Sequence, residues 1–151
     1  MATFALVGSD TIKINQRLMT DLPHGEVAKV TYETDLATVK TGKNGNTIFA
    51  QNASGFAASM ELKVMRGSAD DKFMQSLLTS YRSNPTGYVL INSELVKRVG
   101  DGQGNVTADT YVLTGGVPSK QIEVMSQVEG DVEQAVCTYS LKFAYSERAI
   151  A

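Results

Sequence analysis

The chain has 151 residues, 42% of them hydrophobic and 20% charged, and its formal net charge is −2. This length suits one domain that buries a core without staples, so we expect a single domain over residues 1–151. The weak negative charge argues against a protein that wraps nucleic acid by neutralising phosphates, and the single cysteine excludes a disulfide framework and a cysteine metal cluster.

The N-terminal third predicts short strands. The first residues have no basic signal-peptide region, and no apolar run reaches the roughly eighteen residues of a membrane helix. We therefore expect a soluble chain made in the cytoplasm, with no membrane insertion. Alternation of apolar and polar residues predicts strands at Thr11–Asn15 and Glu26–Thr34, and the turn signal Pro23-His24-Gly25 lies between them.

A polar, glycine-rich segment from 34 to 55 follows, and GKNGN within it suits a tight turn with positive φ. The next segment alternates strictly. Its predicted apolar face carries Phe56, Ala58, Met60, Leu62 and Val64, and its predicted polar face carries Ala57, Ser59, Glu61 and Lys63.

One helix is predicted, from 68 to about 82. Ser68 and Asp71 form a capping box, and the acidic pair Asp70 and Asp71 stands at the positive end of the helix dipole. Phe73, Leu77 and Tyr81 predict an apolar stripe toward the core, with Met74 and Leu78 beside it.

The last third predicts two long strands joined by a turn at Gly130-Asp131, after a hairpin loop at DGQGN. In the final strand Glu133, Ala135, Cys137, Tyr139, Leu141 and Phe143 alternate with polar residues. At about 3.3 Å per residue the run to Tyr145 would span about 40 Å, twice the usual strand. The fold class predicted is mainly β: an antiparallel β-barrel or sandwich with one flanking helix.

Catalytic chemistry finds little support in the sequence. His24 is the only histidine and sits in a turn, Cys137 is interpreted as a small core residue, and the carboxylates are scattered. GKNGN and DGQGN lack the residues that complete a P-loop or an EF-hand, so hairpin turns explain both better. We expect no enzyme, no metal and no cofactor.

The order of elements resembles the phage tail tube proteins, a family that includes contractile-tail tubes and the related tubes of pyocins and type VI secretion systems. Three stretches carry the resemblance: TGKNGNTIFAQNASGFAASMELKVM, GSADDKFMQSLL, and TYVLTGGVPSKQIEV with TYSLKF. They are patterns without invariant signatures. The resemblance implies a β-barrel-like subunit that forms hexameric rings, which stack into a hollow virion tube for DNA passage during genome ejection.

The resemblance also implies which residues contact other copies and which line the lumen of the tube. The segment 34–55 would be the ring-stacking loop, with candidates Lys40, Lys43, Asn44, Asn46, Gln51 and Asn52, and residues 1–8 would form an extended segment that packs on a neighbour. A DNA conduit needs polar side chains that do not grip phosphates. The lumen-facing candidates are Ser59, Glu61, Lys63, Gln121, Glu123, Gln127, Gln134, Thr138, Ser140 and Lys142, of which Lys63 and Lys142 depart from an acidic lumen.

Partners implied are further copies of the chain, the tail sheath, tape measure, baseplate and tail terminator proteins, and DNA in transit. The location implied is the virion tail, after assembly in the host cytoplasm. Two alternatives stay open: a type VI or pyocin-like tube subunit, or a monomeric β-sandwich that binds carbohydrate or protein.

Overall fold

The structure is a computed structural model that describes residues 4–6, 11–23, 27–87, 90–124 and 132–150. It contains strands, one α-helix and two 3-10 turns within these ranges. In chain order they are β1 (Ala5–Leu6), β2 (Thr11–Ile14), β3 (Arg17–Leu18), β4 (Ala28–Thr31), β5 (Ala37–Thr41), β6 (Thr47–Gln51), η1 (Ala53–Phe56), β7 (Ala58–Met65), α1 (Ala69–Ser83), β8 (Ile91–Gly100), β9 (Val106–Pro118), β10 (Glu123–Val124), η2 (Val132–Ala135) and β11 (Val136–Ile150).

Nine of the strands form one antiparallel sheet, in the order β3-β2-β8-β9-β11-β7-β4, with β1 beside β8 and β10 beside β11. β5 and β6 form a separate two-stranded sheet. The expected mainly antiparallel β fold with one flanking helix is confirmed. The large sheet does not close by hydrogen bonds among the described residues, because its path ends on β3 and on β4.

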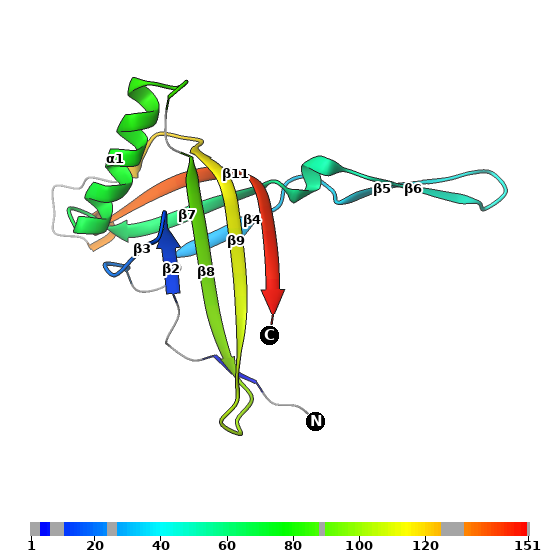
Figure 1. Cartoon of the computed structure of the whole chain (residues 1–151), viewed down its shortest axis with the longest axis horizontal. Helices are drawn as coiled ribbons and strands as arrows, with labels where there is room; N and C mark the ends of the chain where they lie inside the picture. The colour runs from blue at the N-terminus through cyan, green and yellow to red at the C-terminus, as the bar shows by residue number, and fades with distance from the viewer. Residues whose placement is uncertain (1–3, 7–10, 24–26, 88–89, 125–131, 151) are drawn as a thin grey trace.

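β11 belongs to both halves of the bent sheet. Its residues 136–143 pair with β7, and residues 141–150 pair with β9. Figure 1 shows it running beside β7 and then turning to follow β9. Gly116 lies where the direction changes, and a Cβ there would stand 2.4 Å from the Phe143 ring and 2.8 Å from the Ile91 carbonyl oxygen. Glycine is therefore required for the close approach of β9 to β8 and β11.

The core lies inside this bend. Along β7, Ala58, Met60, Leu62 and Val64 are buried, and along β11 the buried residues are Cys137, Tyr139, Leu141 and Phe143. These are the alternating faces that the sequence predicts, except that Phe56 falls in the η1 turn and is half-buried. Ile12 and Ile14 from β2, Ile91 from β8 and Leu113 from β9 join the cluster.

α1 closes one end of the core. Its N-cap is Ser68, whose hydroxyl accepts a hydrogen bond from the Asp71 N–H at 3.2 Å, as the capping box predicts. Of the expected stripe, Phe73 and Leu77 are half-buried and pack against the core, and Tyr81 is half-buried. The neighbouring Met74 and Leu78 are fully buried.

The reason lies one turn earlier, at Asp70, which is fully buried and turns its side of the helix inward. The Arg17 guanidinium stacks over the Phe73 ring at 5.2 Å and keeps that ring at the rim of the core.

The final strand differs from its predicted form. Glu133 and Ala135 fall in the η2 turn, so the strand begins at Val136, and it extends to Ile150. The strand predicted before it is described only as the two-residue β10, and the predicted turn at Gly130-Asp131 lies outside the described residues. The expected hairpin loop at DGQGN is present between β8 and β9, with positive φ at Gly102 and Gly104.

None of the helices among the described residues has the length and apolar character needed to cross a membrane. The predicted Pro23-His24-Gly25 turn falls largely outside those residues.

Candidate assembly surfaces

The first candidate surface is a polar sheet face formed by β4, β7, β10 and β11. Strand pairing sets Glu61 beside Lys29 on one side and Ser140 on the other. A second row holds Ser59 between Thr31 and Lys142, and a third holds Thr138 between Lys63 and Glu123. Because every second residue of β7 and of β11 up to Phe143 is buried in the core, the rows all lie on the opposite face, which we call the polar face.

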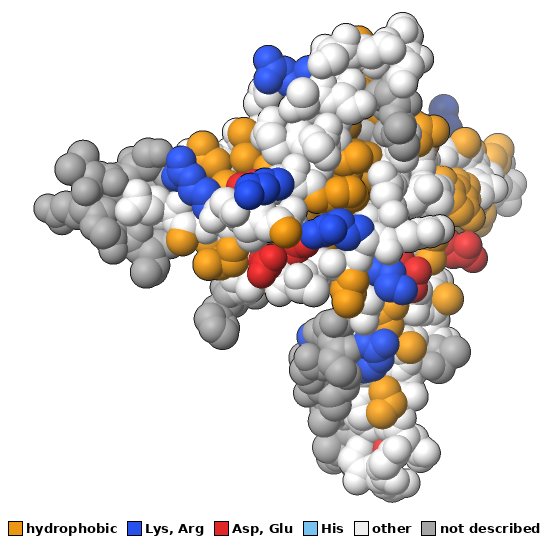
Figure 2. Space-filling view, turned by 60° about the vertical axis from the view of Figure 1, so that its left-hand side comes forward, with side chains coloured by type: hydrophobic (Ala, Val, Ile, Leu, Met, Phe, Trp, Pro, Cys, Tyr) orange, Lys and Arg blue, Asp and Glu red, His pale blue; other side chains and the backbone are white. Residues whose placement is uncertain are grey.

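The polar face carries balanced charge. Its lysines are Lys29, Lys63 and Lys142, and its carboxylates are Glu61, Glu123 and Glu33, the last of which accepts a hydrogen bond from the Ser59 hydroxyl at 3.2 Å. Lys29 stands directly beside Glu61, and Thr138 separates Lys63 from Glu123. Figure 2 shows basic side chains interspersed with acidic ones across one side of the molecule.

Seven of the ten lumen-facing candidates lie together on this face: Ser59, Glu61, Lys63, Glu123, Thr138, Ser140 and Lys142. The other three do not join them. Gln121 is exposed in the segment before β10, Gln134 lies in the η2 turn, and Gln127 is outside the described residues. Sequence reasoning missed Lys29, because the face assignment was made for the long strands and not for the short edge strand β4.

The second candidate surface is the open edge of the large sheet at β4. The Val27 carbonyl accepts a hydrogen bond from the Lys63 N–H at 2.7 Å, so residues 27, 29 and 31 turn their backbone groups toward β7. In an antiparallel ladder the intervening residues point the other way. The N–H and C=O groups of Ala28 and Val30 therefore face the open edge.

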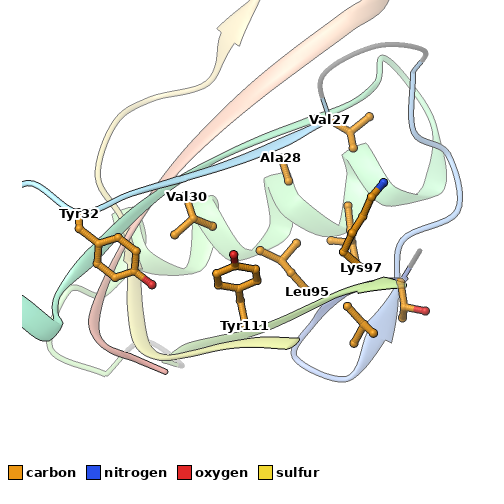
Figure 3. Close-up of a pocket in the computed structure, with 10 residues that line it drawn as sticks. Val27, Ala28, Val30, Tyr32, Leu95, Lys97 and Tyr111 are labelled. Carbon is orange, nitrogen blue, oxygen red and sulfur yellow. The ribbon is translucent and has the colours of Figure 1, made fainter. Parts of the chain in front are cut away.

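A groove of about 400 Å³ runs along this edge, between β4 and the β2–β8–β9 layer. Figure 3 shows Val27, Ala28 and Val30 on one wall facing Leu95 and Tyr111 on the other. The groove separates the edge strand β4 from β2, β8 and β9, and its lining is mainly apolar.

The third candidate surface is the β5–β6 hairpin. The segment 34–55, expected as a loop, is instead an ordered hairpin that projects well beyond the rest of the molecule (Figure 1). The GKNGN turn closes it, with hydrogen bonds from the Gly42 N–H to the Asn46 carbonyl at 2.7 Å and from the Gly45 N–H to the Gly42 carbonyl at 3.0 Å. Every strand residue is exposed.

The six ring-stacking candidates lie along this hairpin. Lys40 belongs to β5 and Gln51 to β6, Lys43, Asn44 and Asn46 form the turn, and Asn52 is at the base. Sequence reasoning missed the apolar side chains between them, Val39, Ile48 and Phe49, whose β-propensity is the signal that predicts strands here.

Two polar contacts join elements of the fold behind these surfaces: a hydrogen bond between Tyr139 and Asp71, and an ion pair between Arg148 and Asp109. The Tyr139 hydroxyl donates to the Asp71 carboxylate at 2.5 Å, and burial together with this hydrogen bond raises the pKa of Tyr139. Burial, reinforced by the nearby Asp71 charge, also raises the pKa of the Cys137 thiol, consistent with a core role. On β9 and β11 the Arg148 guanidinium contacts Asp109 at 2.7 and 3.0 Å and lowers the pKa of that carboxyl.

Among the described residues no group of three or more His, Cys, Asp or Glu side chains is placed to hold a metal ion. Of the expected N-terminal segment 1–8, residues 4–6 are described, and Ala5–Leu6 pairs with the end of β8 at Val99 and Gly100.

Comparison with protein-family models gives no match for this chain, and comparison with curated proteins gives none either. Solved structures do match its fold. One is described as the anti-feeding prophage cap (AFP tube terminating cap), at a TM-score of 0.64 and 10% identity over 94% of this chain and 88% of that one.

A second is the PVC sheath/tube terminator of an extracellular contractile injection system in its extended state, at a TM-score of 0.63 and 10% identity over 95% of this chain and 94% of that one. A third is the PVC sheath–tube complex in its extended state, at a TM-score of 0.62 and 9% identity over 94% of this chain and 88% of that one. At such identities the likeness establishes the fold: this chain has a fold found in contractile injection system assemblies.

Proposed function

We propose that this chain is a non-enzymatic structural subunit of a phage tail tube, acting as a single domain whose hexameric rings stack into a conduit for DNA. The observation that carries the proposal is the uncovered polar face that ends on an edge strand, β4, which is paired only with β7. An unpaired edge invites another strand in a monomer, and a closed ring of sheets removes it. Residues 28 and 30 offer the donors and acceptors for that pairing.

The charge of the polar face supports a lumen. Three lysines and three glutamates lie on it, so a passing phosphate backbone meets no net positive field to hold it. Sheath, tape measure, baseplate and terminator proteins are the partners that such a tube requires, and the virion tail, assembled in the host cytoplasm, is its location.

The first experiment measures assembly. Purified protein is followed from nanomolar to high micromolar concentration by mass photometry and negative-stain microscopy. We expect rings and then tubes. A strict monomer at every concentration, with no ring in stain, would overturn the proposal and favour a monomeric binding module.

A matched pair of variants tests the β4 edge. Ala28→Pro removes the outward N–H without touching the β4–β7 hydrogen bonds, and Ala28→Ser keeps that N–H. We expect the proline variant to remain monomeric with its melting temperature within a few degrees of wild type, and the serine variant to assemble. Assembly by both variants would exclude this edge from the ring contact.

Lumen position is tested by Glu123→Lys in virions. With tubes intact, the added positive charge should slow DNA delivery, and unchanged delivery would remove Glu123 from the lumen. A tube that carries protein, as in secretion or pyocin-like systems, would assemble equally well, and tubes isolated without DNA-containing particles would favour it.

A second candidate function is a tube terminator, because two of the similar structures are described as a terminating cap and a terminator. A terminator forms a ring that does not stack on itself. Rings that never grow into tubes at any concentration, yet shorten tubes of a separate tube protein, would favour this function.

A further inference from the structure

The tip of the β5–β6 hairpin holds the only Asn-Gly dipeptide of the sequence, Asn44-Gly45. An asparagine side chain becomes a carboxylate when the main-chain nitrogen of the next residue attacks its amide carbon and closes a succinimide ring. A side chain on that next residue hinders the attack, and glycine has none. Even a Cβ added at Gly45 would meet no atom within 4 Å, so the space around the reacting nitrogen is open.

The hairpin tip also leaves the Asn44 side chain able to reach that nitrogen. Residues 41–50 are all exposed, and the hairpin carries them well beyond the rest of the molecule (Figure 1). In the described part of the chain no hydrogen bond engages the Asn44 side chain. The Gly45 N–H donates to the Gly42 carbonyl at 3.0 Å, and the attack requires this bond to open. Opening at an exposed loop tip costs little free energy, because few contacts are lost.

Nearby charge favours the reaction. The Gly45 nitrogen must lose its proton to hydroxide, so an anion develops at the tip. Lys43 precedes Asn44, Lys40 lies in β5, and residues 36–52 contain no acidic residue. Positive charge stabilises a developing anion and raises the local concentration of hydroxide.

The hairpin loop between β8 and β9 provides a contrast. There Asp101 also precedes a glycine, Gly102. Its carboxylate accepts hydrogen bonds from the Gln103 N–H at 2.7 Å, from the Asn105 side-chain amide at 2.9 Å and from the Asn105 N–H at 3.2 Å. The bond from the Asn105 side chain, followed by the one from Gln103, lowers the pKa of Asp101, and an ionised carboxylate resists attack by an anionic nitrogen. Asp101 is therefore held unreactive, and Asn44 is not.

The other six asparagines are less reactive for identifiable reasons. Each precedes a residue that has a side chain, and Asn84 precedes Pro85, which has no N–H to lose. The side chains of Asn15, Asn52, Asn84 and Asn105 each also take part in a hydrogen bond of 3.0 Å or less.

We propose that Asn44 is a site of spontaneous deamidation in the folded chain, which yields aspartate and isoaspartate with hydroxide and water as the only reagents. The Gly45 nitrogen gives its proton to hydroxide and bonds to the Asn44 Cγ. The Cγ–Nδ2 bond breaks, and Nδ2 takes a proton from water and leaves as ammonia. Water then opens the succinimide. Cleavage of the bond from the nitrogen to Cγ gives aspartate, and cleavage of its bond to the Asn44 main-chain carbonyl carbon gives isoaspartate.

Either product changes the tip of the hairpin. The new carboxylate is ionised at neutral pH, so the charge of residues 36–52 falls from the +2 of two lysines to +1, two lysines less one carboxylate. Isoaspartate also adds a carbon to the main chain between Gly42 and Asn46, whose hydrogen bond at 2.7 Å closes the hairpin. A subunit therefore acquires a less positive hairpin with age, and with isoaspartate the turn is also longer.

Peptide mapping by mass spectrometry tests the proposal. Full-length protein, at concentrations where it is monomeric, is incubated at pH 8 beside a synthetic peptide of residues 38–50, and an isoaspartyl methyltransferase assay counts isoaspartate. We expect Asn44 to convert before any other asparagine, at a rate within about tenfold of the peptide, because the tip opens at little cost. The rate should rise with pH. An intact Asn44 after the peptide has fully converted, or earlier conversion of another asparagine, would overturn the proposal.

Three variants separate the chemistry from the electrostatics. Asn44→Gln keeps the amide but would need a larger ring, so residue 44 should stay unconverted, and conversion at the wild-type rate would overturn the ring mechanism. Lys43→Gln should slow the reaction by about two- to fivefold, because the adjacent charge is lost. Lys43→Arg keeps that charge and should match wild type. Equal rates in Lys43→Gln and wild type would overturn the part assigned to Lys43.

Discussion

Asp70 connects α1 to the N-terminal strands by hydrogen bonds, so we expect its replacement to lower the unfolding free energy by a measurable amount. The carboxylate is fully buried, and one oxygen accepts from the Thr20 and Asp21 N–H groups, both at 2.7 Å. Its other oxygen meets the Arg17 guanidinium at 3.3 Å. Three donors on one carboxylate make it the connection that sets the helix against β3.

Asp70→Ala removes the acceptor for both backbone donors. Hydrogen bonds to a charged acceptor contribute about 1.5–3 kcal/mol each, and part of the loss is recovered because water reaches the partly buried donors. The Arg17 pair adds little, since that side chain is 40% exposed. We expect a loss of about 3–4 kcal/mol of unfolding free energy.

Asp70→Asn keeps an acceptor of the same shape but loses the charge, which also favours the helix N-terminus by about 0.5 kcal/mol. We expect a loss of about 2 kcal/mol, smaller than for alanine.

Urea unfolding followed by circular dichroism, at concentrations where the chain is monomeric, measures both variants at constant slope. Lys72→Gln, an exposed change in the same helical turn, is the control and should stay within about 0.5 kcal/mol. A loss below about 1 kcal/mol for Asp70→Ala would refute the assignment of Asp70 as the anchor of α1.

Three further outcomes follow from the same structure. Tyr139→Phe should make the unfolding free energy less sensitive to alkaline pH. Burial raises the pKa of Tyr139 in the folded protein above the ordinary value near 10, so the folded protein keeps this proton while the unfolded chain ionises. Wild-type stability is therefore full below pH 10 and falls above it by about 1.4 kcal/mol per pH unit. Urea titrations of both proteins from pH 8 to 11 check this, and a constant difference between them would contradict it. Gly116→Ala should cost about 3 kcal/mol or more, because its Cβ meets both the Phe143 ring and a backbone oxygen, and a melting temperature unchanged from wild type would exclude the clash. Gln16→Gly should add about 0.5–1 kcal/mol, since Gln16 has φ 68° in the β2–β3 turn and glycine adopts that conformation without strain; the midpoint of urea unfolding reports the gain, and a loss would refute it.

The proposed contacts also explain why a stable monomer would carry such an exposed hairpin. Its apolar side chains and the unpaired edge of β4 are association hazards for a free chain. In the stacked assembly that we propose, these groups would be covered by neighbouring copies.

Patterns within ten or fifteen residues were sufficient for much of the fold. Strict alternation identified the buried faces of β7 and β11, and the Ser68 cap identified the start of α1, because the pleat and the first helical turn are set by neighbouring residues. The glycine clusters at 42–46 and 101–105 identified both hairpin turns for the same reason.

Only the tertiary structure decided how these pieces combine. The short strand β4 became the open edge beside the polar face, and Asp70 turned α1 so that Met74 and Leu78 are fully buried while Phe73 and Leu77 pack half-buried beside them. The polar segment expected as a loop became a braced hairpin, because Asn52 and Gly55 close its base against residues 35–38. Such contacts join residues that no local pattern relates, so the sequence determined which faces are buried, and long-range packing determined which faces and edges remain open for assembly.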